Sequence, residues 1–264
     1  MIGRFGGRVA LVTGAGGPAG IGFATARLLG KEGARVAIAS TTERIHERVA
    51  DLEADGITAS GHVGNLVHDG IADRIVAEVL NAHGRLDILV NAAGMTFVGE
   101  PEADLALLDT TEAEWDRVIA LNLRTAFSTT RAALPALLEA APGARIVYVS
   151  SVTGPLVSNP RSSAYSAAKA ALTGLARSLA IEVGRSGVTV NCVLPGWIAS
   201  GSQLPEEVIA GANTPLGRSG TVDEVAEAIA FLASPGASYI TGQTLVVDGG
   251  NVVQEYKGPA DGYY

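Results

Sequence analysis

The stretch that decides the fold is Val9-Ala-Leu-Val-Thr-Gly-Ala-Gly-Gly-Pro-Ala-Gly-Ile-Gly22. Its apolar start, Val9–Val12, predicts a buried strand, and the amphipathic segment Ile21–Lys31 predicts a helix. The turn between them carries the glycines Gly14, Gly16, Gly17, Gly20 and Gly22. Glycine lets a backbone approach a pyrophosphate, and a helix N-terminus supplies N–H donors. Any tight strand-to-helix turn can use glycine, but this position favours a nucleotide site.

Short apolar runs and longer amphipathic segments alternate along the rest of the chain. We expect strands at Val36–Ala39, Ile57–Val63, Leu86–Val90, Arg145–Val149, Thr189–Val193 and Thr244–Val247. The expected helices cover Glu43–Asp55, Asp69–Asn81, Glu112–Glu139, Ala164–Val183 and Val222–Leu232. Thr111 is the expected N-cap of the long helix Glu112–Glu139, and Pro135 its expected kink. Strict alternation with right-handed crossovers predicts an α/β fold with a doubly wound parallel sheet in a single domain.

Two segments interrupt this alternation. Residues 196–220 form a long loop with a short helix expected at Pro205–Gly211. We predict that this loop is a substrate lid, because such lids commonly follow the carboxyl ends of parallel strands. Residues 251–264 carry three tyrosines and form either a frayed tail or an arm that docks on a neighbouring subunit. The predicted domain is therefore 1–250, followed by a C-terminal tail.

Composition excludes several classes of function. The net charge of −8 and the pI near 5.0 argue against nucleic acid and anionic membrane surfaces as partners. A single cysteine, Cys192, excludes an internal disulfide and a cysteine-based metal cluster. The four histidines lack metal-ligand pairing, so no metal is expected, and His62 is interpreted as a surface residue. The start of the chain has no signal-peptide pattern and no apolar run spans a membrane, which predicts a cytoplasmic protein.

The second informative pattern is Tyr165-Ser-Ala-Ala-Lys169, within an expected helix. Spacing by four residues puts phenol and ammonium on one face of the helix. The cation favours phenolate, so the tyrosine pKa should fall from about 10 toward working pH. Tyr165 can then act as a general acid/base on a carbonyl or alcohol oxygen, which the hydroxyl of Ser151 could also hold. This pattern indicates hydride-transfer chemistry.

In combination, these motifs resemble the short-chain dehydrogenase/reductase family over nearly the whole chain. The matching residues are Thr13-Gly14, Gly20-Ile21-Gly22, Asn91-Ala92-Ala93-Gly94, Asn122, Ser151, Tyr165, Lys169, Pro195-Gly196 and Asp248-Gly249-Gly250. The resemblance is nearest to bacterial ketoreductases of the 3-oxoacyl reductase type and to broad secondary-alcohol dehydrogenases. It implies a Rossmann-type sheet, an NAD(P)-dependent oxidoreductase and commonly a homotetramer.

Two departures from the family pattern stand out. The family loop TGxxxGxG gains two extra residues between Gly14 and Gly20, which leaves open which amides meet the pyrophosphate. The family's NNAG becomes Asn91-Ala92-Ala93-Gly94, so the second asparagine is lost while Asn91 remains to brace the sheet. Neither change removes a reactive group.

The resemblance implies a role for each catalytic residue. Tyr165 would be the acid/base, and Ser151 would orient and polarise the substrate oxygen. Lys169 would lower the tyrosine pKa and hydrogen-bond the nicotinamide ribose. Asn122 would hold a water that links Lys169 to solvent, although in isolation it could be an exposed or capping residue. Ser150 competes with Ser151, but alternation sends their side chains to opposite faces, and the family spacing favours Ser151.

Cofactor choice depends on the residues after the second strand. An acidic residue about 20 positions beyond the glycine turn would bind a ribose 2′-hydroxyl. Here that position is Ser40, and Arg44 with Ser40 and Thr41 could accept a 2′-phosphate, which favours NADP(H). Alternatively, Arg44 is a solvated residue and Glu43 turns inward to the ribose, which would make NAD(H) the cofactor.

The resemblance also implies cofactor contacts elsewhere. Besides the glycine turn with Ile21, and besides Tyr165 and Lys169, these contacts are Asn65, Leu66, Asn91, Ala92, Gly94, Pro195, Gly196 and Ile198. Asn65 and Leu66 match the position beside the adenine. Pro195, Gly196 and Ile198 should line the nicotinamide pocket.

The sequence therefore predicts hydride transfer between a nicotinamide cofactor and a carbonyl/secondary-alcohol pair. The mostly apolar lid favours reduction of an apolar ketone. An acyl-carrier-protein partner is less favoured, because it would be acidic and this chain is acidic overall, with no basic cluster around the lid apart from Arg218. The alternatives are an NAD-dependent polyol or hydroxysteroid dehydrogenase and a non-catalytic nucleotide-sensing protein. The intact Ser/Tyr/Lys set argues against the sensor.

Overall fold

The computed structural model describes residues 3–94, 105–255 and 257–258. Its central sheet has seven parallel strands in the order β3-β2-β1-β4-β5-β6-β9. The strands are β1 (Val9–Thr13), β2 (Arg35–Ser40), β3 (Ala59–Val63), β4 (Ile88–Asn91), β5 (Arg145–Val149), β6 (Thr189–Pro195) and β9 (Thr244–Val247). This confirms the doubly wound parallel fold. The winding reverses between β1 and β4, where such sheets open a crevice for ligands.

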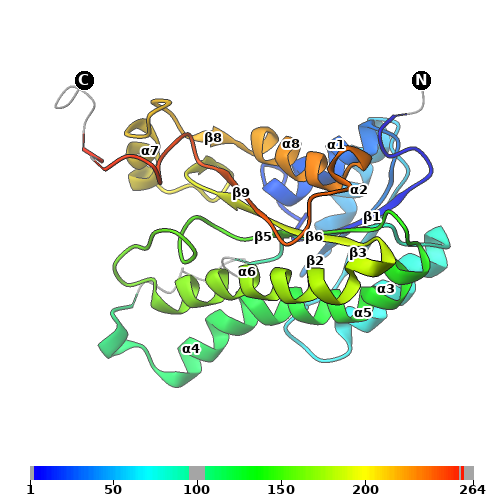
Figure 1. The fold of residues 1–264 in the computed structure, drawn as a ribbon, viewed down its shortest axis with the longest axis horizontal. Helices are drawn as coiled ribbons and strands as arrows, with labels where there is room; N and C mark the ends of the chain where they lie inside the picture. Colours follow the sequence, from blue (N-terminus) through cyan, green and yellow to red (C-terminus); the bar gives the residue numbers. More distant parts are fainter. Residues whose placement is uncertain (1–2, 95–104, 256, 259–264) are drawn as a thin grey trace.

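Helices cover both faces of the sheet (Figure 1). One layer contains α1 (Ile21–Lys31), α2 (Ile45–Ala54) and α8 (Val222–Ala233). The other contains α3 (Ile71–His83), α4 (Glu112–Ile119), α5 (Thr125–Glu139) and α6 (Ser163–Val183). Strand β1 is buried throughout, with Ala10 and Val12 in the core under α1, and Val9 and Leu11 in the core on the opposite face. A strand buried on both faces needs a continuous apolar run, which is what the sequence shows.

The predicted long helix Glu112–Glu139 is wrong in one respect. A π-helical turn, Ala120–Arg124, separates α4 from α5, and Pro135 lies inside α5. Here the Asn122 amide donates to the carbonyl of Val118, and the Thr125 hydroxyl donates to that of Leu121. Side chains that bond to the helix backbone in this way accompany distortion of its regular ladder. The N-cap prediction is confirmed, since the Thr111 hydroxyl accepts from the Glu114 amide at 3.2 Å.

Residues 196–220, the predicted lid, are more regular than a loop. Besides α7 (Pro205–Ala212), they contain β7 (Ile198–Ala199), which pairs in parallel with β8 (Gly220–Thr221). The C-terminal segment contacts the lid, because the Gln254 amide donates to the Asn213 carbonyl at 2.8 Å. Tyr256 and residues 259–264 lie outside the described residues, so both interpretations of the tail stay predictions. None of the described helices is long and apolar enough to cross a membrane.

Helix α1 packs against β1 so closely that Gly22 has no room for a side chain. A Cβ atom there would lie 2.6 Å from the carbonyl oxygen of Gly14 and 3.1 Å from that of Thr13. Both neighbours are backbone atoms that cannot rotate away. Gly174, by contrast, lies on the exposed side of α6, and a Cβ atom there would have no neighbour within 4 Å.

We therefore expect Gly22→Ala to lower the free energy of unfolding by about 1–3 kcal/mol, because the added methyl forces the backbones apart. Gly174→Ala is the matched control and should raise it by about 0.5–1 kcal/mol, the usual gain from replacing glycine in a helix. Urea unfolding followed by circular dichroism measures both. Equal stability of the two variants would contradict the packing described.

Candidate active site

The predicted catalytic residues meet at the carboxyl ends of the central strands. Ser151 follows β5 by two residues, while Tyr165 and Lys169 lie in the first turns of α6, which packs beside β6. Asn122 comes from the π-helical turn between α4 and α5. Three separate segments therefore supply the four residues. Parallel strands bring such segments to one edge of a sheet, which explains their convergence.

Lys169 is the most deeply buried charge of this group. It is 4% exposed, and its Nζ donates to the Val149 carbonyl oxygen at 3.2 Å. The same Nζ lies 5.5 Å from the centre of the Tyr165 ring. Burial lowers the pKa of the Lys169 ammonium to about 8, an effect only partly opposed by the nearby Cys192 thiol. Burial therefore brings the pKa of this ammonium closer to neutral pH than the pKa of an exposed lysine.

The two serines at the end of β5 differ in their surroundings. Ser150 is buried, and its Oγ donates to the Lys169 carbonyl oxygen at 2.8 Å. Ser151 is half-buried, and its Oγ accepts from the Thr153 amide at 3.1 Å. The hydroxyl of Ser150 therefore faces the backbone of α6. Ser151 is the serine that remains partly accessible at the strand end.

Asn122 is not the exposed residue that its isolated sequence allowed. It is 1% exposed, and its Oδ1 lies 2.9 Å from the position that a Cβ on Gly94 would occupy. The Lys169 Nζ lies 3.3 Å from that same position. Gly94 therefore lies where the Asn122 amide and the Lys169 ammonium approach each other. A side chain at this position would enter the space between them.

The glycine turn connects β1 to the end of β4. A Cβ on Gly14 would lie 2.5 Å from the Ala92 carbonyl oxygen, so the two backbones touch. The Thr13 hydroxyl accepts from the amides of Ala92 and Ala93, each at 3.2 Å. The enlarged part of the turn is closed by a bond of 3.1 Å from the Gly20 amide to the Gly17 carbonyl. Nothing lies within 4 Å of a Cβ on Gly17, which leaves its backbone accessible.

A second group of residues lies where the glycine turn meets the end of β2. A Cβ on Gly16 would lie 2.7 Å from the Ser40 Cβ and 2.9 Å from the Arg44 Nε. That Nε is buried and has no hydrogen-bond partner among the described residues. A guanidinium N–H without an acceptor, beside a glycine cradle and a serine, fits an anionic group such as a phosphate. Thr41, the third predicted member, is exposed beside them.

The inward-turned Glu43 of the alternative interpretation is wrong. Its carboxylate side chain is 83% exposed and lies 3.1 Å from the His46 Nε2. Glu43 precedes α2, and its carboxylate lies in solvent beside His46. The residues that do face the glycine turn are Ser40 and Arg44.

The remaining predicted cofactor residues surround the same edge of the sheet. Asn65 caps the turn after β3 by accepting from the Val67 amide, whereas the Leu66 side chain is buried in the core. Asn91 is buried, and its Nδ2 donates to the Thr130 hydroxyl at 3.1 Å. Pro195 ends β6, and the Gly196 amide donates to the Val247 carbonyl at 2.9 Å. Ile198 is buried in the core beneath α8.

The expectation that His62 is a surface residue is wrong. It is 6% exposed, its Nδ1 lies 2.9 Å from the Glu78 carboxylate, and its Nε2 lies 2.9 Å from the Ser60 hydroxyl. The Nε2 of His83 lies 2.8 Å from the same hydroxyl. The alternation Ser60-Gly-His62 on one face of β3 was the available signal, because both polar side chains point toward α3. In the described part of the chain, no three His, Cys, Asp or Glu residues are arranged to hold a metal.

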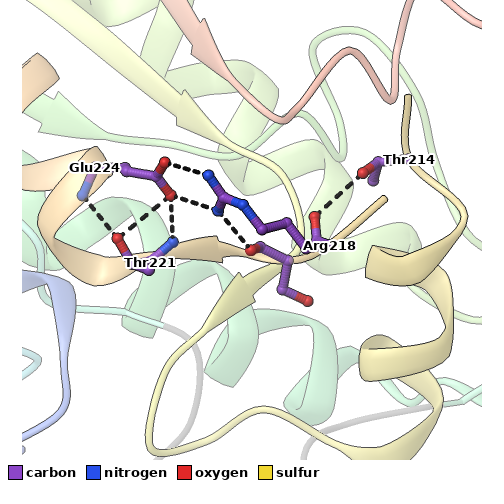
Figure 2. Close-up of polar contacts among 5 residues, drawn as sticks. Thr214, Arg218, Thr221 and Glu224 are labelled. Atoms are coloured by element: carbon purple, nitrogen blue, oxygen red, sulfur yellow. Dashed lines mark hydrogen bonds and ion pairs between the residues drawn. The ribbon is translucent and has the colours of Figure 1, made fainter. Parts of the chain in front are cut away.

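Polar bonds attach the lid at both ends. The Gly201 amide donates to the carbonyl of Ala19, one of the residues within the enlarged glycine turn, at 3.0 Å. At the far end, Figure 2 shows the Arg218 guanidinium contacting both carboxylate oxygens of Glu224, at 2.7 and 2.9 Å. The bond to Arg218 lowers the pKa of Glu224 to about 2. The same carboxylate accepts from the Thr221 amide, which joins the end of the lid to the N-terminus of α8.

The chain is similar to known proteins over nearly its whole length. A family model described as enoyl-(acyl carrier protein) reductase matches residues 14–251. A 3-oxoacyl-(acyl-carrier-protein) reductase of Thermotoga maritima is 37% identical over 255 residues, covering 95% of this chain and all of that protein. The chain belongs to the short-chain dehydrogenase/reductase family. As a member of it, the protein is a nicotinamide-dependent oxidoreductase.

Solved structures of short-chain dehydrogenases agree with this assignment. A dehydrogenase/reductase from Sinorhizobium meliloti superposes with a TM-score of 0.86 at 34% identity, covering 93% of this chain and 95% of that one. A short-chain dehydrogenase from Burkholderia cenocepacia in complex with NADP gives 0.85 at 33% identity, covering 94% of this chain and 99% of that one. The likeness extends over the whole domain.

Burial of the Lys169 ammonium predicts a pH-dependent stability. Its folded pKa of about 8 lies below the ordinary 10.5, so between these values the unfolded chain binds more protons and stability rises with pH. Lys169→Met removes this dependence. The stability of the wild type relative to this variant should therefore increase by about 2 kcal/mol between pH 7 and pH 9.5.

Denaturant unfolding of both proteins across this pH range measures the difference, in which the titrations of groups remote from Lys169 cancel. A difference that stays constant would mean that the folded protein does not disfavour the ammonium.

Proposed function

We propose that this dehydrogenase/reductase reduces an apolar ketone with NADPH, using Tyr165 as general acid. The observation that carries the proposal is the buried Lys169 ammonium, which lies beside the Tyr165 ring at the strand end that bears Ser151. An ammonium in this place favours the phenolate that remains when the phenol gives up its proton. In the proposed site, Tyr165 supplies a proton and Ser151 a hydrogen bond to the same substrate oxygen.

Each residue has a separate task in the proposed reaction. The nicotinamide ring, when bound, supplies the hydride for the carbonyl carbon. Ser151 donates a hydrogen bond to the carbonyl oxygen, and Tyr165 transfers its phenolic proton to that oxygen. Lys169 stabilises the resulting phenolate and hydrogen-bonds the nicotinamide ribose. Lys169 then gives a proton to the phenolate and so restores the phenol. A water held by Asn122 returns a proton from solvent to the neutral Lys169 amine. Positioning and proton transfer carry the reaction, with no covalent bond to the protein.

The cofactor preference is proposed from the Gly16, Ser40 and Arg44 group. The unpartnered Arg44 Nε and the Ser40 hydroxyl would hold the 2′-phosphate of NADP(H). The related Burkholderia dehydrogenase, whose structure contains NADP, supports this choice. NAD(H) as preferred cofactor lacks its main support, because Glu43 faces solvent.

The rest of the cofactor would lie along the same edge of the sheet. We assign to it Gly14, Gly16, Gly17, Gly20, Ile21, Gly22, Ser40, Thr41, Arg44, Asn65, Leu66, Asn91, Ala92, Gly94, Tyr165, Lys169, Pro195, Gly196 and Ile198. The accessible backbone at Gly17 suits the pyrophosphate. Because the Leu66 side chain is buried, its contribution would come from the backbone.

The lid supports an apolar substrate. On and beside α7, Leu204, Val208 and Ile209 are 43%, 53% and 66% exposed, so the lid presents hydrocarbon beside its polar groups. Relatives named as 3-oxoacyl reductases support a ketone rather than a polyol or hydroxysteroid. The acidic Glu206 and Glu207 on the same helix favour a free small-molecule ketone over one carried by an acidic protein.

Assembly and location complete the proposal. By family resemblance we propose a homotetramer that works in the cytoplasm. Light scattering on the purified protein measures the subunit number, and a monomer at working concentration would refute the assembly.

Tyr165→Phe tests the mechanism. Loss of the phenolic proton should reduce kcat for NADPH-dependent ketone reduction by about 100-fold or more, the usual contribution of a general acid. NADPH affinity, followed by cofactor fluorescence, should change little because the ring remains. A variant that keeps full activity on a panel of ketones would remove Tyr165 from the mechanism. A wild type that binds NADPH but turns over no ketone or alcohol would instead favour the sensor.

Arg44→Ala tests the cofactor subsite. The dissociation constant for NADPH should rise about 10-fold to 100-fold, the usual cost of losing hydrogen bonds to a charged group, while NADH binding should be nearly unchanged. Glu43→Gln is the matched control, since it removes a neighbouring exposed charge and should alter neither affinity. A wild type that prefers NADH, or a Glu43→Gln variant that loses NADH selectively, would reverse the assignment.

A further inference from the structure

Two hydrogen bonds in opposite directions join the end of β5 to α6. The Ser150 hydroxyl donates to the main-chain oxygen of Lys169 at 2.8 Å. The Lys169 ammonium donates to the main-chain oxygen of Val149 at 3.2 Å. Both serine and lysine are 4% exposed, so water does not compete for these bonds. One residue of the helix is thus held at its backbone and at the tip of its side chain by two consecutive residues at the strand end.

This pair of bonds fixes the register of α6 relative to Ser151. Ser151 is the next residue after Ser150, so its position follows the strand end directly. Tyr165 lies one helical turn before Lys169, so its position follows the helix. A shift of the helix along its axis or a rotation about it would lengthen the bond from Ser150 to Lys169. The separation of the serine and tyrosine hydroxyls therefore depends on a residue that reaches neither substrate nor cofactor.

Close packing alone does not set this register. A Cβ on Gly154 would lie 2.3 Å from the Ser166 carbonyl oxygen, which shows that the loop after β5 touches the backbone of α6. Such contact limits how near the helix comes to the loop, but it is non-directional. A hydrogen bond weakens steeply with misalignment, so Ser150 adds the directional constraint that packing lacks.

We propose that Ser150 is a positioning residue, whose hydroxyl holds Lys169 and Tyr165 in catalytic register with Ser151. This inference rests on the function proposed above for Ser151, Tyr165 and Lys169. Loss of the hydroxyl leaves the Lys169 carbonyl with its helical hydrogen bond, because a carbonyl oxygen has two lone pairs. The fold therefore survives the substitution, and the effect appears in catalysis.

Ser150→Ala is the direct test, with Ser234→Ala as matched control. Ser234 is also 4% exposed, and its Oγ donates to a main-chain oxygen at the end of a helix, that of Phe231 in α8, at 2.7 Å. Both variants lose a serine bond to a helix carbonyl, and Ser234→Ala also loses the bond that its Oγ accepts from the Gly236 amide at 3.1 Å, so the control removes at least as much bonding. Only Ser150 adjoins the site. We expect Ser150→Ala to lower kcat about 10-fold or more through misorientation of the reacting groups, with a KM for the ketone within about threefold of wild type. Ser234→Ala should leave kcat unchanged.

The pH profile separates positioning from mere stability. Misplacing the ammonium weakens its hold on the phenolate, so the apparent pKa in the kcat profile of Ser150→Ala should rise by about half a unit or more. Ser150→Thr keeps the hydroxyl and should restore most of the rate and the wild-type profile. If Ser150→Ala and Ser234→Ala have the same kcat, pH profile and loss of stability, Ser150 is only structural and the inference is overturned.

Failure of the proposed function has a different signature. In that case the wild type reduces no ketone, or Tyr165→Phe remains active. The stability comparison between wild type and Lys169→Met, repeated in the Ser150→Ala background, still reports on the hydrogen-bonded pair of Ser150 and Lys169. If Ser150→Ala shifts the pH dependence of this stability difference and Ser234→Ala does not, the result supports the positioning of Lys169 by Ser150. If Ser150→Ala leaves that pH dependence unchanged, the inference is overturned.

Discussion

The functional edge of this molecule depends on how closely the ends of β1 and β4 approach each other. Gly14 touches the Ala92 carbonyl with no side chain between them, and the Thr13 hydroxyl bridges the two strand ends by accepting from two amides just past β4. The winding of the sheet reverses here. The glycine turn follows from one strand, and Gly94, beside Asn122 and Lys169, follows from the other. A change in the contact between Gly14 and Ala92 would therefore move both the glycine turn and Gly94.

Lys169 places an ammonium group in the buried interior of the protein, where charged groups are rarely found. Its ammonium is buried against a carbonyl oxygen, and burial is the main cause of its lowered pKa. Buried charges oppose folding, and the surrounding core must offset that cost. The continuously buried strands β1, β4 and β5 supply such a core. The reactivity proposed for the strand ends thus depends on apolar residues that take no part in the chemistry.

Sequence patterns predicted the fold well because alternation is a local property. The strands at Val9 and Arg145 and the pairing of Tyr165 with Lys169 follow from spacing within single elements. The π-helical turn at Asn122 could not be found this way, since it depends on side chains that bond to the helix backbone. The burial of His62 depends on α3 covering β3, and Glu43 lies at the surface beside His46. These are contacts between separate residues in three dimensions, which periodicity does not encode.

The lid is held at its ends, by Gly201 on the glycine turn and by Arg218 on Glu224, whereas the apolar side chains of α7 remain exposed between them. The apolar side chains of α7 and the candidate catalytic residues at the strand ends lie on different segments of the chain. Substitutions on the exposed face of α7 can therefore accumulate without disturbing proton transfer or cofactor contacts. For the function proposed above, such separation would make the protein evolvable, because substitutions on α7 would change its range of substrates through near-neutral steps while the reaction stays the same.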